Sequence, residues 1–202
     1  MITGPAADLD QVGREVDLGA FDAQPLPSSG ACRCATERVV ELFPGLDGEY
    51  FLTLPVDEPA VDPAEIRRAL TDRSALSEVG AVTFYCDFFA PGDYESPLSA
   101  KMVLDRERRL LYISRAVIPV GKDGSVVPGA LKKNVGLFLF KRWFLEHLGA
   151  RASVETSLDR QEGLEQLRWL ELGLQVRCLK IHHIGFGIDV PAQVAALEER
   201  LG

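Results

Sequence analysis

The chain has 202 residues, of which 47% are hydrophobic; this is enough apolar material for one sizeable core, so we expect a single domain spanning residues 1–202. Thirty acidic residues against 22 basic ones give a formal charge of −8, which argues against a nucleic acid polymer as a partner, because gripping phosphates needs clustered Lys and Arg. No apolar run reaches the roughly 18 residues that span a bilayer, and the first residues form no signal segment. We therefore expect a cytoplasmic protein without a membrane partner.

Along the chain, short β-like runs alternate with helical ones, which is the pattern of an α/β fold. The clearest helix start is Asp62, a capping residue followed by Pro63 at the first helical position and by Glu65 three residues after the cap. We expect strands near 1–3, 50–54, 81–88, 101–104, 110–114, 133–140 and 175–181, and helices near 8–16, 35–43, 62–70, 142–148, 158–172 and 190–201. This order predicts a mixed, mostly parallel twisted sheet flanked by helices.

Cysteine and histidine give little sign of a metal centre. Cys32 and Cys34 are separated by one residue, whereas structural zinc sites use wider gaps and a second pair of ligands. His182 and His183 are adjacent, so in a strand their side chains would point to opposite faces. We expect reduced thiols and ordinary histidines.

Two aspartates are better placed for chemistry. Ligands of open α/β sheets bind at the carboxyl ends of strands; Asp57 follows the apolar run 50–54, and Asp189 precedes the last helix. If they converge, their oxygens would suit Mg²⁺, which uses one or two carboxylates together with substrate phosphates. Asp is also a common helix cap, and Asp-Glu-Pro is a common turn, so the residues alone leave both interpretations open.

Six stretches resemble, in order, motifs of the 3-deoxy-manno-octulosonate cytidylyltransferases (CMP-Kdo synthetases). The stretches and the motifs are TLPVDEPAVDPAEI at 53–66 (NVQGDEP), SPLSAKMVLD at 96–105 (NPNxVKVV), YISRAVIP at 112–119 (YFSRxxIP), NVGLFLFKRWFL at 134–145 (HxGIYGYRxxFL), LDRQEGLEQLRWLELG at 158–173 (LExxExLEQLRxLxxG) and GFGIDVPAQV at 185–194 (GxGVDTPEDL). The resemblance implies a Rossmann-like sugar-nucleotidyltransferase fold, in which the anomeric hydroxyl of a 2-keto sugar acid attacks the α-phosphorus of CTP and pyrophosphate leaves.

The resemblance also assigns site residues. Asp57 and Asp189 match the magnesium-binding aspartates and form, with Arg115, the catalytic set. Four positions match family residues that contact the sugar acid: Lys101, Asn134, Glu162 and Gln166. Two positions match family residues that contact the nucleotide: Thr36 and Arg38. An Arg suits a substrate carboxylate because its planar fork binds both oxygens. The alternative for each residue is a structural role, as a solvated charge or as a polar position on a helix.

The chain departs from the family at its beginning and at single positions. No stretch matches the family's first strand and the IPARxxSxRxPGKPL loop that cradles the triphosphate, and another segment or chain would have to complete the sheet. Single-residue departures from the motif residues are Pro55, Val56, Asn134, Phe138 and Phe140. A misplaced start codon would also explain the missing loop.

Two functions therefore stay open. One is an active cytidylyltransferase that uses CTP and Kdo or a related acid, which the retained site positions favour. The other is a non-catalytic homologue that acts as a binding or partner subunit, which the missing triphosphate loop favours. The resemblance further implies a homodimer, and a completing partner chain is a second possibility.

Overall fold

The computed structural model describes residues 2–4, 25–27, 34–55, 58, 61–71, 79–88, 92–152, 154, 156–182 and 192–201. Contacts divide the chain into two compact units, one made of Met1–Phe51 with Arg142–Val154 and the other of Leu52–Lys141 with Glu155–Gly202. The expected single domain stays a prediction, and the helix expected at 8–16 lies outside the described residues. Within the described part, no helix has both the length and the apolar composition needed to cross a membrane.

In its described residues, the first unit contains two short parallel strands and two α-helices. The strands are β1 (Ile2–Gly4) and β2 (Pro25–Pro27), and the helices are α2 (Ala35–Leu42), continued by the 3₁₀ turn η2 (Phe43–Gly45), and α5 (Arg142–Gly149). Arg142 fixes the start of α5, because its Nε donates to the Gly48 carbonyl at 2.8 Å and its guanidinium lies over the rings of Phe43 and Phe51.

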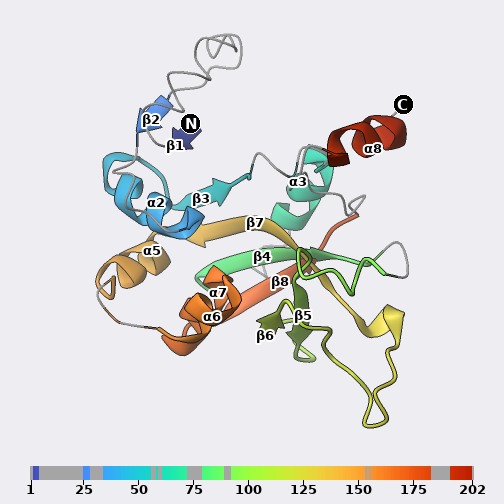
Figure 1. Cartoon of the computed structure of the whole chain (residues 1–202). Helices are drawn as coiled ribbons and strands as arrows, with labels where there is room; N and C mark the ends of the chain where they lie inside the picture. Colours follow the sequence, from blue (N-terminus) through green and yellow to red (C-terminus); the bar gives the residue numbers. More distant parts are fainter. Residues whose placement is uncertain are drawn as a thin grey trace. The chain divides into compact units, whose positions relative to one another are not determined.

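The second unit is built on a mixed sheet (Figure 1). Its strands are β3 (Tyr50–Thr53), which begins in the first unit, β4 (Ala81–Cys86), β5 (Lys101–Leu104), β6 (Leu110–Ser114), β7 (Lys133–Lys141) and β8 (Val176–Lys180). The order is β6-β5-β7-β4-β8, and β3 also pairs with β7. The predicted mixed α/β sheet is confirmed.

The antiparallel share of the described pairings is larger than the sequence predicts. β4 is parallel to β8 but antiparallel to β7, and β5 is antiparallel to both β6 and β7. A short connection allows only antiparallel pairing of β5 with β6. Asp105 holds that turn, since its Oδ1 accepts the backbone N–H groups of Glu107 and Arg109 at 2.8 Å each.

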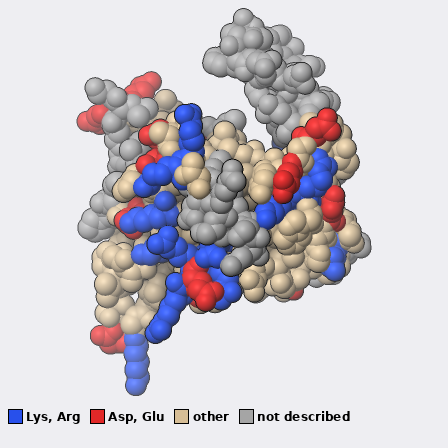
Figure 2. Space-filling view, turned by 180° about the vertical axis from the view of Figure 1, so that it is seen from behind, with Lys and Arg blue, Asp and Glu red and all other residues tan. Residues whose placement is uncertain are grey.

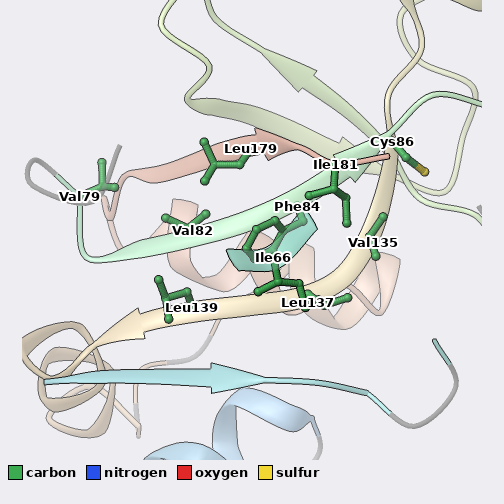
Figure 3. Packing of buried hydrophobic residues seen from close by; sticks show 10 residues of the cluster. All are labelled: Ile66, Val79, Val82, Phe84, Cys86, Val135, Leu137, Leu139, Leu179 and Ile181. Carbon is green, nitrogen blue, oxygen red and sulfur yellow. The ribbon is translucent and has the colours of Figure 1, made fainter. Parts of the chain in front are cut away.

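Helices cover both faces of this sheet. The other helical elements in the part of the chain that the structure describes are α3 (Pro63–Thr71), α6 (Leu158–Glu162), α7 (Glu165–Glu171), α8 (Ala192–Leu201) and the 3₁₀ turn η3 (Pro128–Ala130). On one face, Ile66 of α3 packs in a buried cluster with strand residues that include Leu137 of β7 (Figure 3). On the other face, Phe138 and Phe140 of β7 meet the Trp169 ring of α7 edge-on, with ring centroids 5.1 and 5.4 Å away.

The single helix expected at 158–172 is wrong. The structure has two helices there, because Gly163 caps α6 in the left-handed conformation with φ 65° and Leu164 is extended. Glycine adopts this conformation without the steric cost of a Cβ atom, and it commonly ends helices in this way. The break places Glu162 at the end of α6 and Gln166 in the first turn of α7.

Candidate functional site

Lys101, at the start of β5, is buried beneath the loop 96–99. Its side chain is 0% exposed, and its Nζ donates to the carbonyls of Ser96, Ser99 and Arg115 at 2.8, 2.7 and 2.7 Å. Burial lowers the pKa of Lys101, and the nearby charge of Arg115 lowers it further. An ammonium group has three hydrogens, so these carbonyls use all of them. A direct bond to a substrate would have to replace one of these three.

Arg115, directly after β6, is half-buried and is held by main-chain carbonyls. Its Nε donates to the Glu162 carbonyl at 2.8 Å, and Nη1 donates to the Pro97 carbonyl at 2.7 Å. Longer contacts of 3.5 Å join Nη1 to Leu98 and Nη2 to Gly163. Contacts of that length are weak, so Nη2 keeps capacity for a strong acceptor such as a carboxylate.

The carboxylate of Glu162 is fixed against the end of β6. Its Oε1 accepts the hydroxyl of Ser114 at 2.7 Å, and its Oε2 accepts the backbone N–H of Arg115 at 2.9 Å. The Ser114 hydroxyl oxygen in turn accepts the N–H of Ala116 at 3.0 Å. Sequence reasoning missed Ser114, although a hydroxyl residue directly before Arg115 was the available signal.

Asn134 and Gln166 form a second polar group on the α7 face of the sheet. Oδ1 of Asn134 accepts the Thr83 hydroxyl at 3.3 Å and the Gln166 amide at 3.2 Å. The Asn134 backbone N–H bonds the Ala100 carbonyl at 2.9 Å, directly before Lys101. The structure therefore brings Asn134 close to Lys101 and pairs it with Gln166. Thr83 is buried, and no sequence pattern marked it as a site residue.

The remaining predicted site residues lie elsewhere or outside the described residues. Thr36 is buried and Arg38 half-buried in α2, and the Arg38 backbone N–H bonds the Cys34 carbonyl at 3.4 Å in the first turn. Asp57 and Asp189 lie outside the described residues. Among the residues that are described, no group of three His, Cys, Asp or Glu side chains could hold a metal ion. The nucleotide and magnesium assignments stay predictions.

An apolar pocket of about 430 Å³ opens at the end of β3 in the second unit. It is lined by Leu52, Leu54, Glu58, Val61, Pro63, Ile66 and Arg67. Near it, the Glu58 backbone N–H bonds the Pro55 carbonyl at 3.3 Å. None of the predicted site residues that the structure describes lines this pocket.

The surface is not uniformly acidic despite the net charge of −8. In the view from behind, Lys and Arg side chains lie beside Asp and Glu side chains (Figure 2). The electrostatic potential at a site depends on the charges near it rather than on the net charge of the chain. An anionic ligand is therefore compatible with this acidic composition.

Comparison with curated proteins identifies relatives of one kind. The chain is 31% identical to the 3-deoxy-manno-octulosonate cytidylyltransferase of Geobacter metallireducens, over 97% of this chain and 79% of that protein. It is also 31% identical to the protein of the same name from Chlorobium limicola, over 91% of this chain and 74% of that protein. No family model matches the chain. Neither relative is described as non-catalytic, so the non-catalytic alternative gains no support.

Solved structures agree on the fold. A CMP:2-keto-3-deoxy-manno-octonic acid synthetase complexed with CTP superposes with a TM-score of 0.81 at 22% identity, over 98% of this chain and 78% of that one. The 4-diphosphocytidyl-2C-methyl-D-erythritol synthase of Anaerococcus prevotii gives a TM-score of 0.60 at 13% identity, over 98% of this chain and 78% of that one. The mixed sheet with helices on both faces is therefore a fold that this chain shares with these nucleotidyltransferases.

Proposed function

Because the chain belongs to the 3-deoxy-manno-octulosonate cytidylyltransferase family, we propose that it transfers CMP from CTP to a 2-keto sugar acid and releases pyrophosphate. The observation that carries the proposal is the half-buried guanidinium of Arg115, held by carbonyls on one side while Nη2 has only a 3.5 Å contact. A guanidinium fixed in this way is preorganised to bind the carboxylate of the acid.

The neighbouring amides supply groups for the sugar hydroxyls. Oδ1 of Asn134 is used by Thr83 and Gln166, which leaves the Asn134 amide N–H groups to donate to a ligand. The Gln166 side chain is fixed by the same bond. Together with Arg115, these residues would orient the acid so that its anomeric hydroxyl faces the α-phosphorus of CTP.

The nucleotide and metal parts of the proposal follow from family membership. Thr36 and Arg38 would contact the nucleotide, and Asp57 and Asp189 would bind Mg²⁺. The ion would neutralise phosphate charge as pyrophosphate leaves. The test is to replace each aspartate with Asn: turnover should fall at least about 100-fold in both variants, as expected when a charge-stabilising group is removed. Turnover that is independent of Mg²⁺ would contradict this assignment.

The activity itself is tested by incubating the purified protein with CTP, Mg²⁺ and 3-deoxy-manno-octulosonate or related acids, and by measuring pyrophosphate release. The Arg115→Ala variant should raise the KM for the acid by about 10-fold to 100-fold, since a charged hydrogen bond contributes about 1.5–3 kcal/mol. The matched control is Arg106→Ala, which removes an exposed arginine from the β5–β6 turn and should leave turnover unchanged. No turnover with any acid would contradict the proposal.

We further propose that the active form is a homodimer. Leu111 of β6, the last strand on one side of the sheet order, is 57% exposed, and Val120 and Val127 of the following connection are also exposed. Exposed apolar side chains near a sheet edge are typical of association surfaces. Light scattering across a concentration series should give twice the mass of the chain; a monomer at all concentrations would contradict the dimer.

A further inference from the structure

Four consecutive carbonyls of the loop 96–99 all face two cationic side chains. Those of Ser96 and Ser99 accept hydrogen bonds from Lys101, and those of Pro97 and Leu98 accept them from Arg115. The third bond of Lys101 goes to the main-chain carbonyl of Arg115 itself. The loop therefore wraps the two cations and connects one to the other.

We propose that Lys101 is a positioning residue: it fixes the Arg115 backbone and the loop 96–99 that holds the guanidinium, and it does not contact the acid. This inference rests on the proposed function, in which Arg115 binds the acid. It assigns different tasks to two cations that family resemblance places together on the sugar-acid side.

The surroundings of Lys101 and Arg115 separate the two tasks. Lys101 is 0% exposed, and its three hydrogens point to three carbonyls at 2.7 to 2.8 Å. Arg115 is only half-buried, and its Nη2 has a single contact of 3.5 Å. Removing the Lys101 ammonium would take one donor from each of three carbonyls, two of them in the loop and one on Arg115; the Ser96 carbonyl would keep the Ser99 N–H at 3.2 Å.

A double-mutant cycle tests the proposal. Affinity for 3-deoxy-manno-octulosonate is measured by titration calorimetry in the original protein and in the Lys101→Met, Arg115→Ala and double variants. We expect Lys101→Met alone to weaken binding about 10-fold but to change affinity less than about 2-fold in the Arg115→Ala background, because residues that act through one another are not additive. Losses that multiply would overturn the proposal, since they mean that Lys101 contacts the acid independently. Lys122→Met, at an exposed lysine, is the matched control and should keep the original affinity.

A second measurement tests the structural role of Lys101 independently of the activity. We call the bonds from Lys101 to the loop 96–99 and to the Arg115 carbonyl the clamp. Amide hydrogen exchange should speed up at Leu98, Ser99 and Arg115 in Lys101→Met, but not in Lys122→Met. If the original protein binds no acid while these amides respond, the proposed function fails and the clamp stands. Unchanged exchange overturns the clamp.

If Lys101→Met does not fold, acetylation of native lysines followed by mass spectrometry provides the test. Lys101 should stay unmodified, with or without the acid, under conditions that modify Lys122. Acetylation of Lys101 in the folded protein at the rate of Lys122 would overturn the proposal, because an accessible ammonium is not clamped.

Discussion

Arg115 and Glu162 are joined twice, and each bond runs between a side chain of one residue and the main chain of the other. The guanidinium Nε donates to the Glu162 carbonyl, and the Glu162 carboxylate accepts the Arg115 backbone N–H. Both bonds go to main-chain groups, so they do not pair the guanidinium with the carboxylate. The guanidinium therefore keeps its capacity to attract an anionic ligand. The arrangement also couples the end of β6 to the break between α6 and α7.

Ser114 is the residue that completes this coupling, so its hydroxyl should matter for stability. It is 3% exposed and both donates to Glu162 and accepts from Ala116. We expect Ser114→Ala to lower the free energy of unfolding by about 1–3 kcal/mol, because the Glu162 carboxylate and the Ala116 N–H both lose a hydrogen bond to a buried hydroxyl. Urea denaturation measures the change. The control Ser125→Ala, at an exposed hydroxyl, should stay within about 0.5 kcal/mol; equal effects would contradict the role of Ser114.

The left-handed conformation of Gly163 predicts a backbone cost for any side chain there. Its φ is 65°, and a Cβ at this position would first meet Arg115 at 3.9 Å, so space is available and only the backbone is strained. Gly163→Ala should destabilise the protein by about 1–2 kcal/mol, and Gly163→Asn by less. Gly129→Ala, where a Cβ meets nothing within 4 Å, should be close to neutral. A stabilising Gly163→Ala would contradict the two-helix arrangement.

Local signals in the sequence predict the elements well where chemistry fixes a boundary. Asp62 caps α3 as expected, since its Oδ1 accepts the Ala64 N–H at 2.7 Å and the helix begins at Pro63. The bounds of β5 and β6 are those predicted, because a charged turn separates two β-rich runs. The break at Gly163 was missed because the leucines on either side continue an apolar spacing typical of one helix.

The candidate site shows a different limit. Cationic residues such as Lys101 and Arg115 stand out in a sequence. Their partners in the loop 96–99 are main-chain carbonyls, and every residue has a main-chain carbonyl. Sequence gives no way to tell which carbonyls converge, so it could not predict that Lys101 and Arg115 bind the same loop. Thr83 was missed for a related reason: it is a β-branched residue in a strand, where Thr is common for packing alone.

Buried thiols predict a loss of stability at alkaline pH. Burial raises the pKa of Cys86 from an ordinary value of 9.0 to about 12, and burial also raises the pKa of Cys178. Because the pKa is higher in the folded state, the stabilising contribution is complete below about pH 9 and is lost as the pH rises toward 12. Urea denaturation at about pH 8 and about pH 10.5 should show a falling free energy of unfolding.

The substitution that tests the thiol is Cys86→Ala, which should make this fall less steep even though the variant is less stable at neutral pH. Cys34→Ala, at a partly exposed thiol, should leave the pH dependence unchanged. The same pH dependence in all three proteins would show that other groups cause the loss.

The two tryptophans make the packing of α7 on the sheet measurable. Trp169 is 0% exposed against Phe138 and Phe140, whereas Trp143 is 48% exposed. Trp169→Ala should lower the free energy of unfolding by about 3–5 kcal/mol, because it removes a large core side chain and its ring contacts. Trp143→Ala is the matched control, and we expect it to cost less than about 1 kcal/mol. Fluorescence checks the environments separately: Trp169→Phe should leave only the emission of a solvated indole, and Trp143→Phe only that of a buried one. If the two spectra were exchanged, α7 could not pack on β7 in the way that places Gln166 beside Asn134.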